Sequence, residues 1–183
     1  MYKNFLIIKN NFNSYDVSDF LKSLFSLSIK IEEKDDYLII YHNLDDAQLI
    51  KNSISTLGDD LLVSIFAYIS NPIYNLDVEL DIAFNILKNA KAGVYDFKSL
   101  LLNNEINNKN KILNFIISGM GIDEKFIKTY VECNLNATKA SKALYIHRNT
   151  LNYKLDRLKN ERNFDLKNFI DAYILYSLID NKL

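Results

Sequence analysis

The sequence predicts an α+β protein in two parts, a sheet-and-helix domain followed by an all-helical domain. Strand and helix patterns alternate over roughly the first hundred residues, and only helical patterns follow. A polar, Asn-rich segment separates the two parts. We therefore expect one domain at residues 1–102, a linker at residues 103–111 and a second domain at residues 112–183.

The elements of the first part are recognised by their hydrophobic periods. Short apolar runs bounded by polar residues predict strands, and apolar residues three and four apart predict helices. In chain order, the patterns predict a strand at residues 4–10, a helix at 14–26, strands at 28–32 and 37–41, a helix at 45–60, a strand at 61–70, a helix at 76–90 and a strand at 92–97. This β-α-β-β-α-β-α-β order predicts a ferredoxin-like arrangement of helices against one sheet.

The second part is expected to contain only helices. They are predicted at residues 112–118, 123–133, 137–144, 148–159 and 166–179. The last of these carries an apolar stripe formed by Leu166, Phe169, Ile170, Tyr173, Ile174 and Leu178, which Leu175 and Ile179 widen. We expect a homodimer, with this helix or the N-terminal sheet at the interface. The alternative for the stripe is that it closes the core of its own domain.

Composition and charge limit the function classes. The chain has 183 residues, 49 % of them hydrophobic, and a net charge of -1. No apolar run approaches the ~18 residues that a membrane span needs, so no membrane partner is expected. A single cysteine, Cys133, excludes an internal disulfide and favours a reduced, cytoplasmic location.

A basic segment lies near the C-terminus of this slightly acidic chain. Between Asn136 and Arg162 there are seven Lys or Arg residues and only two acidic residues, which gives a local charge of +5. The segment "ATKASKAL" predicts a short helix capped by Asn136, and "YIH" interrupts it. A second helix then presents Leu151, Leu155 and Leu158 at spacings of four and three. The pattern is that of a helix-turn-helix.

The exposed side of this predicted motif suits double-stranded DNA. Arg148, Asn149 and Thr150 form the first turn of the second helix, where a recognition helix meets base edges. Lys139 and Lys142 on the first helix suit the flanking phosphates. The residues expected to contact DNA are Lys139, Lys142, His147, Arg148, Asn149, Thr150, Asn152, Tyr153, Lys154 and Arg157. The alternative is an amphipathic helix pair with ordinary surface charge, serving as a catalytically inactive protein-interaction module.

The same residues resemble a known family. The segments "IHRNTLNYKLDRL", "FDLKNF" and "IDAYILYSLI" are similar to the C-terminal helix-turn-helix of PucR/CdaR-type transcriptional regulators. The matching positions are Asn134 or Asn136, Ala140, Leu144, His147, Arg148, Asn149, Thr150, Leu151, Tyr153, Lys154, Leu155, Arg157, Asp165 and Leu166. Lys154 stands where the family usually has Arg, and Asn163 where it often has Gly. The resemblance implies a DNA-binding transcriptional regulator.

The resemblance also suggests a degenerate GGDEF-like domain in the first part. In active nucleotide cyclases of that type the central hairpin carries Gly-Gly-Asp-Glu-Phe, whereas the comparable stretch here is "EKDDY", residues 33–37. Without the glycines the backbone cannot closely approach a triphosphate. Asp35 and Asp36 are therefore interpreted as a solvated turn rather than metal ligands. The sequence predicts no enzyme activity, catalytic residue, metal or cofactor, and it leaves a small-molecule effector unassigned.

Overall fold

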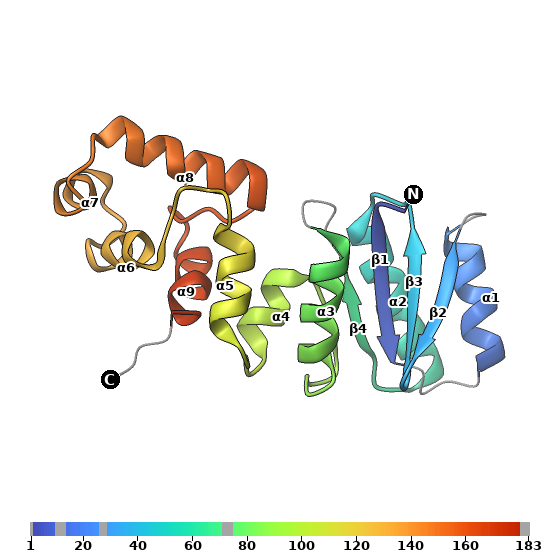
Figure 1. Cartoon of the computed structure of the whole chain (residues 1–183). Coiled ribbons are helices and arrows are strands. Elements are labelled where there is room, and N and C mark those ends of the chain that lie inside the picture. Colours follow the sequence, from blue (N-terminus) through green and yellow to red (C-terminus); the bar gives the residue numbers. More distant parts are fainter. Residues whose placement is uncertain (1, 10–13, 26–28, 71–74, 180–183) are drawn as a thin grey trace. The chain divides into compact units, whose positions relative to one another are not determined.

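The computed structural model describes residues 2–9, 14–25, 29–70 and 75–179. The chain divides into two compact units, Met1–Glu105 and Ile106–Leu183. Unit 1 has mixed α and β structure and unit 2 is helical (Figure 1). None of the helices in the described ranges is long and apolar enough to cross a membrane.

Unit 1 is built around a five-stranded sheet. Its elements are β1 (Asn4–Lys9), α1 (Ser14–Phe25), β2 (Lys30–Lys34), β3 (Tyr37–His42), α2 (Ala47–Leu61), β4 (Phe66–Ile69), α3 (Leu76–Leu87), β5 (Gly93–Tyr95) and α4 (Phe97–Asn103). The strand order is β2-β3-β1-β4-β5. All neighbours are antiparallel except β4 and β5. The predicted element order is confirmed up to β5.

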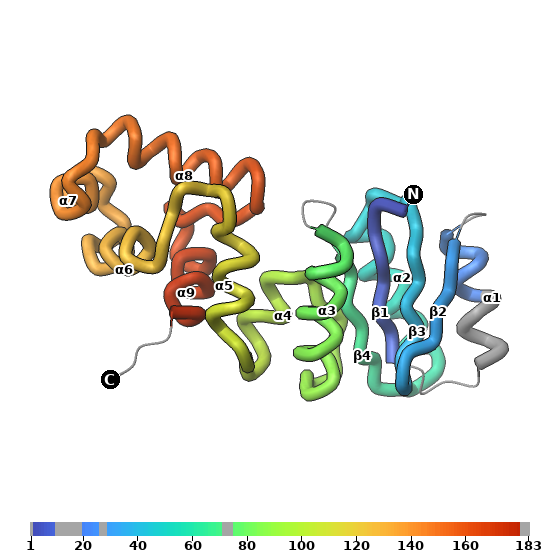
Figure 2. Tube along the Cα trace, in the orientation of Figure 1, coloured from blue at the N-terminus to red at the C-terminus, as the bar shows by residue number. Residues whose placement is uncertain are grey.

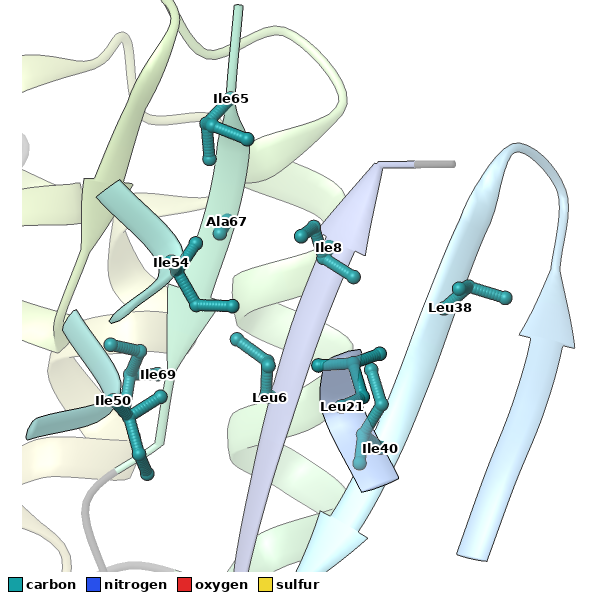
Figure 3. Packing of buried hydrophobic residues seen from close by; sticks show 10 residues of the cluster. All are labelled: Leu6, Ile8, Leu21, Leu38, Ile40, Ile50, Ile54, Ile65, Ala67 and Ile69. Atoms are coloured by element: carbon teal, nitrogen blue, oxygen red, sulfur yellow. The ribbon is translucent and has the colours of Figure 1, made fainter. Parts of the chain in front are cut away.

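Helices cover both faces of this sheet, which explains why its central strands are apolar without alternation. On one face Leu6 and Ile8 of β1 pack with Leu21 of α1 and with Ile50 and Ile54 of α2 (Figure 3). These five side chains are at most 1 % exposed.

The opposite face of the sheet packs against α3. The ring of Tyr37 in β3 meets the ring of Phe84 in α3 edge-on at 5.4 Å. Phe5 of β1 lies beside Tyr68 of β4 with ring centres 5.7 Å apart, and the Tyr68 hydroxyl donates a hydrogen bond to Glu79 of α3.

A histidine is buried at the end of β3. His42 is 1 % exposed, and its ring centre lies 4.5 Å from that of Phe25. Its Nδ1 accepts a hydrogen bond from the Leu44 N–H at 3.2 Å, and its Nε2 has no hydrogen-bond partner among the described residues. Burial lowers the pKa of His42 from 6.5 to about 4, because the charged ring would lose its hydration.

The predicted strand at residues 61–70 is too long. Helix α2 continues to Leu61, and β4 begins only at Phe66. Leu62 takes a left-handed conformation, φ 54°, and its N–H reaches the carbonyls of Gly58 and Asp59. The helix therefore ends in a tight left-handed cap inside a run whose composition is typical of a strand.

The sequence reading also missed α4. Asp96 and Ser99 form a reciprocal capping box, in which each side chain accepts a hydrogen bond from the backbone N–H of the other residue. Phe97, Leu100 and Leu101 are buried behind it. The Asp-x-x-Ser spacing followed by apolar residues was the available signal.

Unit 2 contains α5 (Lys109–Ile117), α6 (Glu124–Glu132), α7 (Ala137–Ala143), α8 (Arg148–Arg162) and α9 (Phe169–Ser177). Helix α4 ends at Asn103 and α5 begins at Lys109, so part of the segment predicted as a linker is helical. The core of the unit collects apolar residues from all five helices: Ile112, Leu113, Ile116, Phe126, Ile127, Tyr130, Ala140, Leu151, Leu155, Leu158, Ile174 and Leu175.

The stripe predicted for the last helix is wrong in part. Phe169, Ile170 and Tyr173 are exposed by 74 %, 53 % and 53 % respectively. The other predicted residues, Leu166, Ile174, Leu175, Leu178 and Ile179, are buried, and they are joined on the inner face by Asp171 and Ala172. Apolar residues surround nearly the whole of α9, so hydrophobic period alone does not select its inner face.

Candidate DNA-binding surface

Helix α7 is fixed at its start by Asn136. The Asn136 side chain accepts the N–H groups of Thr138 and Lys139, both at 3.0 Å. Ala140 is fully buried, and a small residue here lets α7 and α8 pack closely. The predicted cap is confirmed. Figure 2 follows the chain from α6 through α7 into α8.

The turn between α7 and α8 is tight. The N–H groups of Tyr145 and Ile146 donate to the carbonyls of Lys142 and Ser141 at 3.2 and 3.0 Å. Tyr145 has φ 55° and its side chain is 95 % exposed. His147 then caps α8, and its Nδ1 accepts the Asn149 N–H at 3.2 Å.

Helix α8 buries the leucine stripe that its sequence predicts. Leu151, Leu155 and Leu158 are at most 1 % exposed. The first turn of the helix, Arg148 to Thr150, is exposed. Backbone N–H groups at such a helix start have no partner within the helix, so the end is suited to phosphate.

Two basic side chains of α8 turn toward the protein rather than toward solvent. Lys154 donates a hydrogen bond to the Gly121 carbonyl, and its Nζ lies 5.6 Å from the centre of the Phe126 ring. Arg162 donates through Nε to the Ile116 carbonyl at 3.1 Å and through Nη2 to the Ser118 carbonyl at 3.3 Å. Lys154 thus contacts the loop between α5 and α6, and Arg162 contacts the C-terminal end of α5.

In this structure the Lys154 ammonium is therefore engaged by the protein, and its contact with DNA stays a prediction. Its position, three residues after Leu151 and one before Leu155, lies at the border of the buried stripe. A long side chain at that border reaches a neighbouring carbonyl while its stem covers apolar surface.

Other charges of α8 form ion pairs. Arg157 Nε lies 2.7 Å from Glu161 Oε1, one helical turn later. Lys159 pairs with Asp165, and Asp156 pairs with Lys167, each at 2.7 Å.

The basic side chains of α7 and α8 that are not held in this way lie on α7 and at the start of α8. Lys139, Lys142 and Arg148 are exposed and form no ion pair with another described residue. With Asn149 and Thr150 they form what we call the open surface of the helix-turn-helix. Tyr153 is 66 % exposed on α8, and Asn152 is half-buried beside it.

The connection from α8 to α9 is built from carboxylates and amides. Asn163 ends α8 in a left-handed conformation, φ 56°, which Asn tolerates better than most residues. Asp171, buried in α9, accepts the Asp165 N–H at 2.7 Å, and the Asn168 side chain caps α9. Asn163 therefore forms a tight left-handed turn without a glycine.

The predicted β2–β3 hairpin has a charged turn. Asp35 pairs with Lys88 at 2.7 Å, and both groups are exposed. The hydrogen bond from Lys88 lowers the pKa of the Asp35 carboxyl. Among the residues that the structure describes, no group of three His, Cys, Asp or Glu side chains could hold a metal ion.

Two residues of the helix-turn-helix were missed from sequence. Arg162 donates hydrogen bonds to two main-chain carbonyls at the C-terminal end of α5, and no local pattern signals this because its partners lie more than forty residues away. Tyr145 was read only as part of an interruption between helices.

Comparison with known proteins places this geometry in context. Residues 125–179 match the family described as the PucR C-terminal helix-turn-helix domain. A carbohydrate diacid regulator of Escherichia coli (strain K12) is 39 % identical over 56 residues, which cover 31 % of this chain and 14 % of that protein. The DNA-binding transcriptional activator AdeR of Bacillus subtilis (strain 168) is 40 % identical over 57 residues, or 31 % of this chain and 13 % of that protein.

The matched part of this chain thus spans only about one seventh of the length of each of these two relatives. A solved structure titled regulator of polyketide synthase expression, from Bifidobacterium adolescentis, aligns with 96 % of this chain and 77 % of its own. Its TM-score of 0.47 at 13 % identity is too low to support an assignment of fold.

Proposed function

We propose that this chain is a DNA-binding transcriptional regulator of the PucR/CdaR type, which binds double-stranded DNA through α7 and α8. The observation that carries the proposal is the open surface of the helix-turn-helix. Lys139, Lys142 and Arg148 form no ion pair there with any residue that the structure describes, whereas the other cations of α8 are held by protein groups. The PucR match and the two regulator relatives support the same function.

In this proposal the roles divide along the motif. Arg148, Asn149 and Thr150 contact base edges in the major groove, and His147 contributes its cap and a phosphate contact. Lys139 and Lys142 contact phosphates beside the groove. Asn152, Tyr153 and Arg157 flank the contact. Arg157 can bind DNA only after its ion pair with Glu161 is broken.

Selection of bound fragments from genomic DNA tests this function directly. The expected result is enrichment of a short motif, followed by salt-dependent binding of a duplex that carries it. The competing function, a protein-interaction module, predicts no retention on duplex DNA even at low salt. A variant in which Lys139, Lys142 and Arg148 are all Ala should lose binding while it stays folded, since all three are exposed.

For unit 1 we propose a degenerate GGDEF-like domain without catalytic activity. One support is the β-α-β-β-α-β-α-β order of its elements. The other is the turn of the β2–β3 hairpin, which has no glycines to let a phosphate approach the backbone and in which exposed Asp35 pairs with Lys88. No cofactor or metal is part of this proposal. Product formation from GTP with Mg²⁺, abolished by Asp35→Ala, would contradict it.

We also propose a cytoplasmic homodimer that binds two half-sites, because one helix-turn-helix reads only a few base pairs. The exposed face of α9 supplies a candidate contact. The rings of Phe169 and Tyr173 stack with centres 6.4 Å apart, and Ile170 lies between them in sequence. Sedimentation should show that the unmodified chain is a dimer and that the Tyr173→Glu variant is a monomer. If the unmodified chain is found only as a monomer, with and without DNA, the dimer proposal is rejected.

A further inference from the structure

Tyr145 combines backbone strain with almost complete exposure. Its φ is 55°, in the left-handed region that Gly or Asn occupies at little cost. Its side chain is 95 % exposed, the highest fraction among the exposed large hydrophobic residues of the described ranges. A bulky residue in this conformation is unusual, and such residues are concentrated at functional sites.

The fold itself gives Tyr145 no reason to be aromatic. Within the described part of the chain its side chain forms no hydrogen bond, ring contact or ion pair. Its contribution to the turn is its N–H, which donates to the Lys142 carbonyl and which glycine would supply equally. The side chain is therefore dispensable for the turn.

The position of Tyr145 is next to the groups that the proposed function uses. It lies between Lys142 and Arg148, which form no ion pair within the described ranges, and two residues before the His147 cap of α8. A helix-turn-helix that inserts the start of α8 into the major groove brings this turn close to the edge of the groove. Tyr hydroxyls are among the groups that bind DNA phosphates.

We propose that the hydroxyl of Tyr145 donates a hydrogen bond to a phosphate at the edge of the groove that α8 enters. The inference rests on the proposed DNA binding and adds a positioning contact to it. Because phosphates carry no sequence information, the contact should strengthen binding to all duplexes alike. Because Tyr is uncharged, it should release no counterion.

The chain offers a matched control in unit 1. Leu62 has φ 54°, is 93 % exposed and ends α2 in the same left-handed conformation. Leu62→Gly and Tyr145→Gly therefore relieve comparable strain, and only the second removes a group from the helix-turn-helix.

The experiment uses the full chain, with titration of a fluorescent random-sequence duplex and of a duplex recovered by genomic selection, at two salt concentrations. Tyr145→Phe and Tyr145→Gly should each weaken binding to both duplexes about 3- to 10-fold, as expected for the loss of one hydrogen bond. The slope of log affinity against log salt should not change, and the melting temperature of Tyr145→Gly should equal or exceed that of the unmodified chain. Leu62→Gly should bind as the unmodified chain does.

Several outcomes would overturn the inference without touching the proposed function. Unchanged binding by Tyr145→Phe excludes the hydroxyl contact, and a loss confined to the selected duplex indicates base readout instead. A fall in melting temperature for Tyr145→Gly would show that the side chain serves the fold. If the unmodified chain binds neither duplex, the proposed function itself fails.

Discussion

Lys154 on α8 donates a hydrogen bond to the main-chain carbonyl of Gly121, in the loop that joins α5 to α6. Its ammonium also lies 5.6 Å from the centre of the Phe126 ring. A cation within a motif for binding DNA thus serves to hold a loop of its own unit. The distinction between such structural cations and the open surface can be measured.

Replacing Lys154 by Met keeps the apolar stem and removes the ammonium. We expect the free energy of unfolding to fall by about 1–2 kcal/mol, from the lost hydrogen bond and cation–π contact. The salt slope of DNA binding should stay unchanged. Denaturant unfolding and duplex titration measure the two quantities. If the salt slope of DNA binding falls by one, Lys154 contacts a DNA phosphate.

Asn149→Ala separates base readout from phosphate contact. Asn149 lies in the exposed first turn of α8, and its side chain is free to reach an adenine edge. The substitution should cost about 1–3 kcal/mol of binding free energy on the selected duplex and little on random DNA. Equal losses on the two duplexes would show that α8 is not the recognition helix.

Lys142→Ala is expected to behave in the opposite way. Lys142 is exposed on α7 and forms no ion pair with the described residues. Its loss should weaken binding to both duplexes and reduce the salt slope by about one. Titrations at several salt concentrations check this, and an unchanged slope would mean that α7 does not lie along the backbone.

The buried His42 should make unit 1 sensitive to acid. Its pKa is about 4 in the folded chain against 6.5 ordinarily, so the unfolded chain binds the proton more readily. The stabilising contribution of neutral His42 is complete above pH 6.5 and is lost as the pH falls toward 4. The loss amounts to about 2–3 kcal/mol.

Urea unfolding at a series of pH values tests the contribution of His42. His42→Gln should be less stable at pH 7 but should show a flatter dependence of unfolding free energy on pH between 6.5 and 4. A variant whose dependence matches that of the unmodified chain would assign the effect to other groups.

Gly58 is required by the close approach of α2 to Ile65. A Cβ at residue 58 would lie 2.5 Å from Ile65 Cγ1, well inside contact distance. Gly58→Ala should therefore lower the free energy of unfolding by about 1–3 kcal/mol, although Ala is the better helix former. In the background of Ile65→Ala the same substitution should cost much less, and a double-mutant cycle measures the difference.

Period and spacing predicted much of the architecture because these elements are determined locally. The β2–β3 hairpin follows from two apolar runs around a charged turn, and α8 follows from Leu151, Leu155 and Leu158. The orientation of α9 was not predictable in the same way. Ala172 and Ile174 face the core while Phe169 and Tyr173 face solvent, and all four are apolar enough for either side.

The candidate site shows a similar division. The cap by Asn136 is a local hydrogen bond and could be read from sequence. The roles of Lys154 and Arg162 depend on carbonyls of Gly121, Ile116 and Ser118, which only the tertiary fold brings near. The left-handed backbone of Tyr145 likewise has no counterpart in composition or period.

The retention of most α8 cations by protein groups has a consequence for how this chain would search a genome. With Lys139, Lys142 and Arg148 as the unpaired cations of the described α7–α8 segment, one copy of the chain would neutralise about three phosphates. Affinity for arbitrary DNA is then modest at cellular ionic strength, and dwell times away from the target are short. Such a protein exchanges rapidly with free solution between encounters instead of sliding over long tracts, and its occupancy of an operator responds promptly to changes in its own concentration.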